Sequence, residues 1–174
     1  MLYQTIIDSP VGPLTLVASE AGLRAVLWLG DRDPTVMRVQ LGPIDGGGLD
    51  PGGVLAAAVT QLEEYFAGSR TEFDLRLDIE GSEFQRSAWD ELSRIPFGET
   101  VSYGEQARRL GNVRKARAVG AANGRNPISI IVPCHRVVGS NGSLTGFGGG
   151  IQAKAWLLDH ERQVWLDRFV NTSS

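Results

Sequence analysis

The sequence predicts an α/β (α+β) protein of two lobes, and three observations support this fold class. Apolar and polar residues alternate at the start of the chain, apolar residues recur at helical spacing in the middle, and short amphipathic helices follow from Ser82 onward. Hydrophobic residues make up 42% of the 174 positions, which is enough for a real core. The expected parts are a scaffold lobe over residues 1–79, a second lobe over 80–165 and a tail over 166–174.

The N-terminal lobe is expected to open with an antiparallel meander. Strands are predicted over residues 2–7, 14–18 and 23–29. Turn residues at Ser9-Pro10-Val11-Gly12 and at Glu20-Ala21-Gly22 separate these strands. A later alternating stretch over residues 73–79 predicts one more strand.

One helix is predicted between these strands. Its apolar positions recur at helical spacing over residues 54–66, and Gly68 is expected to end it. Residues 30–53 are rich in Gly, Pro and Asp, so we expect mostly a surface loop, in which residues 36–41 could form a short helix. Nothing in residues 1–79 suggests chemistry, which favours a scaffold role.

Helix-capping patterns mark the start of the second lobe. Ser82 and Gln85 have the spacing of a capping box for a helix that Pro96-Phe97-Gly98 is expected to end. Ser102 and Glu105 repeat the pattern for a short helix that reaches Leu110. Gly111-Asn112 is the predicted turn before a second helix over residues 113–123. Two short helices across a Gly-containing turn indicate a helix-turn-helix.

The charge distribution favours a phosphate-rich partner, although the net charge is −3. Residues 1–105 carry 7 basic and 17 acidic side chains, a net charge of −10. Residues 106–158 carry 8 basic and no acidic side chains, a net of +8, and residues 159–174 add −1. A solvated helical face normally mixes both signs, so the basic block is better explained by nucleic-acid binding.

The second helix combines tiny and basic side chains. Close helix packing explains part of the tiny-residue run, but it does not explain the basic residues beside it. Small side chains allow a helix to approach a nucleic-acid backbone while arginines contact phosphate or enter the base stack. The residues concerned are Arg114, Lys115, Ala116, Arg117, Ala118, Gly120, Ala121 and Ala122.

The stretch Ile130–Val137 holds Cys134, the only cysteine, and His135, one of two histidines. An apolar, β-branched run that Pro133 stops predicts that Cys134 ends a buried strand. A free cysteine is most often an inert core residue, but basic neighbours and a histidine are expected to lower the thiol pKa. Because adjacent side chains in extended chain point opposite ways, His135 would reach the sulfur only through a water or a bend.

Pro133-Cys134-His135-Arg136 closely resembles the signature of the O6-alkylguanine-DNA alkyltransferases, the methylated-DNA–protein-cysteine methyltransferases. The resemblance runs from Ser9-Pro10-Val11-Gly12-Pro13-Leu14 to Leu157-Leu158-Asp159-His160-Glu161. It implies a ribonuclease-H-like N-terminal lobe without an active site and a winged helix-turn-helix-like C-terminal lobe. It also implies a single, irreversible transfer of the alkyl group from O6-alkylguanine, and from O4-alkylthymine, in double-stranded DNA to Cys134.

The resemblance also assigns roles to individual residues. Arg117 matches the "arginine finger" that fills the gap left by a flipped-out guanine, and Tyr103 matches the tyrosine that rotates the nucleotide. Asn126 matches the hinge between recognition helix and active-site strand, where a purely structural role and a catalytic role are equally expected. Glu161 matches the carboxylate that orients His135. The further DNA-binding residues expected are Arg114, Lys115, Ala116, Ala118, Gly120, Asn123, Arg125 and Arg136.

The glycine-rich residues 144–150 lack the Lys-Ser/Thr ending of a phosphate loop and resemble the family's substrate-pocket loop. The expected pocket residues are Val137, Phe147, Gly148, Gly149 and Tyr103. Some family members have Tyr and Ser in place of Phe147 and Gly148, so the pocket here is expected to be roomier or less polar.

Two other functions compete with alkyl transfer: a lesion reader that binds alkylguanine without repairing it, and a cysteine hydrolase. Readers of this kind lack the reactive cysteine, and the adjacent Cys-His pair lacks the second partner of a hydrolase. The sequence has no membrane-span-length apolar run or secretory signal. We expect a cytoplasmic monomer with no internal disulfide, no cofactor and no metal.

Overall fold

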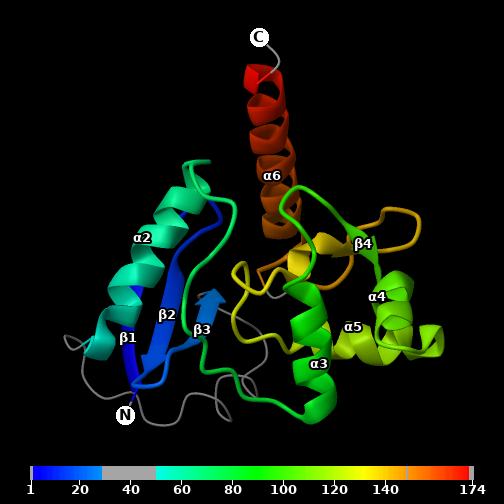
Figure 1. The fold of residues 1–174 in the computed structure, drawn as a ribbon, viewed down its shortest axis with the longest axis horizontal. Helices are drawn as coiled ribbons and strands as arrows, with labels where there is room; N and C mark the ends of the chain where they lie inside the picture. The colour runs from blue at the N-terminus through cyan, green and yellow to red at the C-terminus, as the bar shows by residue number, and fades with distance from the viewer. Residues whose placement is uncertain (1, 29–49, 148, 173–174) are drawn as a thin grey trace.

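A three-stranded antiparallel meander lies at the centre of the N-terminal lobe, which confirms the predicted strands. The computed structural model describes residues 2–28, 50–147 and 149–172. The strands follow the order β1 (Leu2–Ile7), β2 (Leu14–Ser19) and β3 (Leu23–Trp28) (Figure 1). The turn after β1 requires Gly12, which has a φ of 98° and donates its amide to the carbonyl of Ser9 at 3.0 Å.

Helix α2 (Val54–Phe66) follows a 3-10 turn, η1 (Pro51–Gly53), and packs across the sheet (Figure 1). The carboxylate of Asp50 accepts hydrogen bonds from two backbone amides at the helix start, at 2.7 and 2.9 Å. Gly68, with a φ of 83°, follows the helix end as expected. The buried face consists of Val54, Leu55, Ala58, Leu62 and Tyr65.

The strand predicted over residues 73–79 is wrong. Only Leu77 makes a bridge there, in parallel with Leu23 of β3. The side chain of Gln61 explains the interruption, because its amide accepts from the backbone N–H of Asp74 and donates to its carbonyl. A side chain from α2 thus occupies the backbone groups that a neighbouring strand would need. Residues 30–49 of the predicted surface loop, with the short helix predicted over residues 36–41, lie outside the described residues.

The second lobe begins with α3 (Glu83–Leu92), and the predicted capping box is present. The hydroxyl of Ser82 accepts from the amide of Gln85 at 3.1 Å, and the Gln85 side chain accepts from the amide of Ser82 at 3.0 Å. The helix ends at Leu92, earlier than the predicted stop at Pro96-Phe97-Gly98. The hydroxyl of Ser102 then caps α4 through the amide of Glu105.

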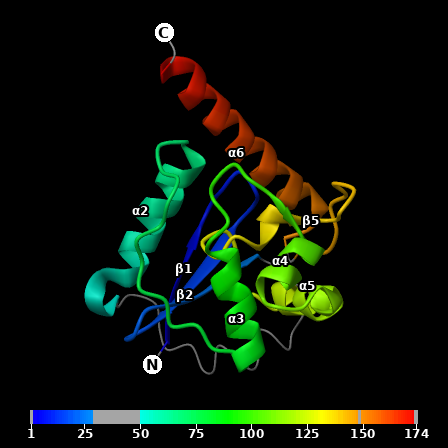
Figure 2. The ribbon, with the colours of Figure 1, turned by 45° about the vertical axis from the view of Figure 1, so that its right-hand side comes forward.

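The helix-turn-helix is confirmed. Helix α4 (Tyr103–Arg109) and helix α5 (Ala116–Gly124) pack side by side, with a 3-10 turn, η2 (Val113–Lys115), between them (Figures 1 and 2). The indole N–H of Trp89 donates to the carbonyl of Ala122 at 2.8 Å, which attaches α5 to α3.

The end of the chain differs from the predicted tail. Helix α6 (Ile151–Thr172) continues well past Glu161, and its C-terminal half projects from the body of the molecule (Figures 1 and 2). Residues 162–172 contain no glycine or proline, so nothing in them breaks a helix. Trp165 and Phe169 stack at 5.4 Å on the exposed part, one helical turn apart.

The two lobes share one hydrophobic core, which brings the active-site segment against the first sheet. Residues from α2, β3, α3 and α6 belong to the same buried cluster. The amide of Val26 in β3 donates to the carbonyl of Pro127 at 2.9 Å, so the segment after α5 lies along the edge of the meander. None of the described helices is long and apolar enough to span a membrane.

Candidate active site and DNA-binding face

Cys134 does not end a strand, contrary to the prediction. The preceding residues form tight turns, in which the amides of Ile131 and Val132 donate to the carbonyls of Ser129 and Ile128 at 2.9 Å. Cys134 then begins a 3-10 helix, η3 (Cys134–Arg136), and the short strand β5 (Val137–Val138) pairs in parallel with β4 (Val101–Ser102). An apolar run of this length predicts burial correctly but does not distinguish a strand from a buried turn.

The turn before Cys134 is strained and held by one side chain. Ile130 has a φ of 74°, a left-handed conformation that is unfavourable for a β-branched residue. Asn126 holds the turn, because its side chain donates to the carbonyl of Val132 at 2.7 Å and accepts from the amide of Ile128 at 3.0 Å. This arrangement is the structural role expected of Asn126; a catalytic role remains a prediction.

The thiol of Cys134 is not activated in the way the sequence suggested. Cys134 is only 8% exposed, and this burial raises the pKa of the thiol above its ordinary value. Hydrogen bonding from Asn126 and Ser129 and the charge of Lys154 oppose the effect of burial without cancelling it. The thiol is therefore protonated at neutral pH and needs a base before it can act as a nucleophile.

His135 and Glu161 form a fully buried pair in which the two side chains are 2.6 Å apart. Burial would raise the pKa of Glu161, but hydrogen bonds and charges from His135 and Arg136 outweigh burial and hold it well below the usual range. Burial also lowers the pKa of His135, so at neutral pH the ring is uncharged, although it is charged at the low pH where Glu161 titrates. An ionised carboxylate only accepts hydrogen bonds, which assigns the imidazole proton to Nε2. The buried Nδ1 then carries a free lone pair, and it has no hydrogen-bond partner among the described residues.

Arg136 is not available to DNA, and its predicted DNA-binding role is wrong. Arg136 is only 6% exposed. The guanidinium donates to both carboxylate oxygens of Glu161, at 2.8 and 3.1 Å, and to the carbonyl of Ile95 at 2.7 Å. The ring of Phe97 lies 5.7 Å from it. Arg136 thus neutralises the carboxylate beside His135.

Helix α5, with the end of η2 before it and Arg125 after it, presents a basic and tiny-residue face to solvent. The exposed residues recur at helical spacing, and within the described residues none of the three arginines among them has an ion-pair partner. A face of this composition is suited to a phosphate backbone. The exposed residues are Arg114, Lys115, Arg117, Ala118, Ala121, Gly124 and Arg125, while Ala116 and Gly120 are half-buried.

Asn123 belongs to the inside of the helix-turn-helix, so its predicted DNA-binding role is also wrong. It is 7% exposed. Its side-chain amide exchanges two hydrogen bonds with that of Gln106 on α4, at 2.7 and 3.0 Å. Gln106 also donates to the carbonyl of Ala88 on α3. These bonds hold the three helices together and satisfy polar groups that would otherwise be buried without partners.

Tyr103 lies at the start of α4, where it contacts both the recognition helix and the glycine-rich loop. A side chain at Gly120 of α5 would meet its ring at 3.7 Å, and its hydroxyl accepts from Thr145 at 3.1 Å. Lys154 of α6, fully buried, donates to the carbonyl of Thr145 at 3.0 Å and lies 5.8 Å from the Tyr103 ring. Nothing in the sequence distinguishes Lys154, because a lysine inside a basic block gives no sign of burial.

The predicted pocket residues are only partly placed by the structure. Phe147 packs edge-on against Trp28 of the first lobe, with ring centroids 5.2 Å apart. Gly149 lies so close to Trp28 that an added Cβ would be 2.5 Å from its ring. Val137 is fully buried in β5, and Gly148 lies outside the described residues. The pocket role of these residues remains a prediction.

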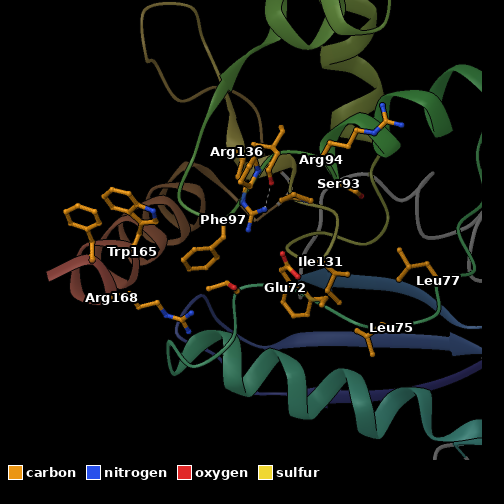
Figure 3. A pocket seen from close by; sticks show the side chains of 16 residues that line it. Glu72, Leu75, Leu77, Ser93, Arg94, Phe97, Ile131, Arg136, Trp165 and Arg168 are labelled. Atoms are coloured by element: carbon orange, nitrogen blue, oxygen red, sulfur yellow. Dashed lines mark hydrogen bonds between the residues drawn. The ribbon is translucent and has the colours of Figure 1, made fainter. Parts of the chain in front are cut away.

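A hollow of about 860 Å³ lies behind the active-site segment and is separate from the reactive thiol (Figure 3). Ile131, Pro133 and Arg136 line it, and Trp165 and Arg168 of α6 line it from another side. Neither Cys134 nor His135 lines this hollow. It is therefore not the alkyl-binding site.

Two family models match the chain, one in each lobe. Residues 2–79 match the 6-O-methylguanine DNA methyltransferase, ribonuclease-like domain. Residues 83–163 match the 6-O-methylguanine DNA methyltransferase, DNA binding domain. Together the two models cover most of the chain.

Several curated proteins and solved structures are similar to this chain over nearly their whole length. The methylated-DNA–protein-cysteine methyltransferase of Mycobacterium tuberculosis is 49% identical over 162 residues, 93% of each chain. The enzyme of that name from Methanosarcina acetivorans is 44% identical over 92% of this chain and 98% of its own. The crystal structure of Mycobacterium tuberculosis OGT in complex with DNA has a TM-score of 0.80 and 47% identity, covering 93% of this chain and 94% of that one.

Fold and site together define a two-domain DNA-binding protein that places a single cysteine directly after a helix-turn-helix. Its first domain is ribonuclease-like, and its second is a DNA-binding domain. The chain belongs to the O6-methylguanine DNA methyltransferase family of DNA-repair proteins.

Proposed function

We propose that this protein repairs alkylated DNA by moving the alkyl group of O6-alkylguanine, or of O4-alkylthymine, onto Cys134. The observation that carries the proposal is the pairing of the buried side chains next to the thiol. Cys134 is followed by a neutral His135, whose Nε2–H is held by Glu161 and whose Nδ1 is free to accept a proton. This arrangement supplies a base to a thiol that is protonated at rest.

The chemical step is a single displacement. His135 takes the thiol proton through a water, and the sulfur of Cys134 attacks the alkyl carbon. A carbon–sulfur bond forms, the bond from that carbon to O6 breaks, and its electron pair stays on guanine, which regains a proton as it leaves. Tyr103 and a backbone amide stabilise the departing base. The thioether has no group that water can displace, so each molecule acts once.

Recognition of the lesion requires extrusion of the base, because a buried thiol cannot reach O6 inside a stacked duplex. The exposed face of α5 approaches the DNA backbone through the minor groove, and Arg117 fills the gap left by the flipped nucleotide. Tyr103 rotates that nucleotide from its place beside α5. The partner is double-stranded DNA, and we propose that the protein acts as a cytoplasmic monomer.

In this proposal the two lobes have different roles. Residues 1–79 form the scaffold, and residues 80–165 bind DNA and carry the chemistry. The hydrogen bond between Val26 and Pro127 supports this division, because it fastens the active-site segment to the sheet of the first lobe. The remaining residues, 166–174, have no assigned part in repair.

Intact-protein mass spectrometry after incubation with O6-benzylguanine tests the proposal. A single stable benzyl adduct on Cys134, absent from Cys134→Ser, is the expected result. No adduct combined with tight binding to alkylated DNA would instead indicate a lesion reader, and repeated turnover without an adduct would indicate a hydrolase.

A further inference from the structure

The first lobe reaches the active site through one hydroxyl group. Tyr65 of α2 is fully buried, and its hydroxyl donates to Oε2 of Glu161 at 2.7 Å. The same oxygen lies 2.6 Å from Nε2 of His135. Tyr65 and Glu161 are 96 residues apart in sequence, which is why no local pattern points to the contact.

Glu161 is surrounded by donors on every side. Its Oε1 accepts from Arg136 and from the amide of Gly98, at 2.8 and 3.2 Å. Its Oε2 accepts from His135, from Tyr65 and from a second nitrogen of Arg136 at 3.1 Å. Burial, followed by the charge and hydrogen bond of Glu161, raises the pKa of Tyr65 well above its ordinary value. The phenol therefore stays protonated and acts as a donor.

The position of the Tyr65 ring is fixed from several directions. Phe66, Phe73 and Phe97 pack around it, with centroid distances of 5.3, 5.6 and 6.0 Å. Its backbone carbonyl lies 2.7 Å from Nε2 of His160, whose ring packs on the Tyr65 ring at 5.3 Å. A hydroxyl held this firmly can fix the carboxylate it contacts.

We propose that Tyr65 is a positioning residue for alkyl transfer: its hydroxyl holds the oxygen of Glu161 that orients His135 and weakens the attraction of that oxygen for an imidazolium. The proposal rests on His135 acting as the base in the proposed function. Three donors share Oε2, so the hydrogen bond from Tyr65 leaves less of its negative charge for His135. By this means the first lobe keeps His135 neutral and able to accept the thiol proton.

The charged groups that face the pair come from two elements. Arg136 of η3 and Lys154 of α6 are positive and disfavour an imidazolium, while Glu161 favours it. Without the phenol, Glu161 attracts the proton more strongly, so the pKa of His135 rises. At pH 6 more of the histidine is then charged and unable to act as a base, whereas at pH 8.5 it is neutral with or without the phenol.

The test compares Tyr65→Phe, which keeps the ring, with Ser19→Ala as a matched control. Ser19 also donates a hydroxyl to a carboxylate in the first lobe, that of Asp78, far along the chain from the active site. Transfer from free O6-benzylguanine, which needs no DNA binding, is followed by intact mass between pH 6 and 8.5. We expect Tyr65→Phe to lose about tenfold in rate at pH 6, the size of one hydrogen bond to a charged group, and less than threefold at pH 8.5.

The outcomes separate the two proposals. A Tyr65→Phe rate that equals wild type, or that falls by the same factor at every pH, overturns the positioning role, because a loss of structure alone does not depend on His135 titration. No adduct on the wild-type protein would refute the proposed function instead. A measurement on the wild type gives an independent test: the imidazole ¹⁵N shifts of the two histidines should show His135 neutral and protonated at Nε2 at pH 7. A charged His135 at that pH would also overturn the inference.

Discussion

Glu161→Gln removes the charge at the centre of the buried network while keeping the size of the side chain. The change leaves the guanidinium of Arg136, which is 6% exposed, without its anionic partner. It also offers His135 an amide in place of a carboxylate. We therefore expect a loss of both stability and transfer rate.

The expected size follows from the burial of the pair. Removing one partner of a buried ion pair typically costs about 3–5 kcal/mol, because the other charge stays desolvated. For a chain of this length, each kcal/mol lowers the melting temperature by about 2–4 °C. Thermal unfolding followed by circular dichroism should therefore show a decrease of roughly 6–20 °C.

Glu105→Gln is the matched control, because Glu105 also pairs with two arginines, Arg108 and Arg109, but at the surface. This control should melt close to wild type, since exposed pairs contribute little. A Glu161→Gln protein that melts within 2 °C or so of the control would refute the reasoning about the buried charge.

The pH dependence of the difference gives a second check on Glu161. Its pKa is lowered in the folded protein, so its stabilising effect is present above about pH 4.5, the ordinary glutamate value, and is lost as the pH falls further. The gap between wild type and Glu161→Gln should therefore narrow on acidification below that pH. A gap that widens there would mean that the carboxyl is not ionised in the folded protein.

Three further predictions concern DNA and the thiol. Arg117→Ala should slow repair of duplex DNA at least tenfold while leaving reaction with free O6-benzylguanine unchanged, because only the duplex requires flipping; Arg86→Ala on α3 is the control, and equal losses on both substrates would contradict the assignment. The logarithm of the binding constant for undamaged DNA should fall with the logarithm of salt concentration with a slope of about −3.6, as expected for about four phosphate contacts. A slope near −7 would mean that all the cations of residues 106–158, including the buried Arg136 and Lys154, reach DNA. Iodoacetamide labelling of Cys134 should increase with pH along a curve whose midpoint lies above that of a free cysteine, because burial raises the thiol pKa; a midpoint below it would contradict the burial argument.

Local patterns predicted the helix-turn-helix correctly because they act over a few residues. Ser82 and Gln85 cap α3 within one turn, and Ser102 caps α4 in the same way. The meander of the first lobe is equally local, since short turns join its strands. The resemblance in the Cys134 segment then led to the family, which the comparisons confirm.

The errors arose where distant residues decide the environment. Arg136 and Lys154 were included among the surface charges of the basic block. In the structure Arg136 binds Glu161, and Lys154 donates to the carbonyl of Thr145. Composition cannot separate a buried cation with a partner from an exposed one. The resemblance placed Asn123 on the DNA-binding face, although Gln106 of the neighbouring helix holds it inside.

The thiol shows how two neighbouring features can act in opposite directions. Basic residues near Cys134 favour a thiolate, and they can be identified from the sequence. Burial favours the neutral thiol, and only the packed structure reveals it to be the larger effect. The expected low pKa was therefore wrong, and deprotonation shifts from the resting protein to the reaction step.

A buried, protonated Cys134 suits a side chain that can be used only once. Thiolates react with oxidants and stray electrophiles, whereas a neutral buried thiol does so slowly. Reactivity then depends on His135 and on the groups that hold it, which come from η3, α6 and α2 and lie away from the face of α5. DNA contact and proton transfer thus meet only at the short segment that Asn126 holds in shape. Substitutions at Arg117 or Glu161 should separate the two functions, while a substitution at Asn126 should impair both at once.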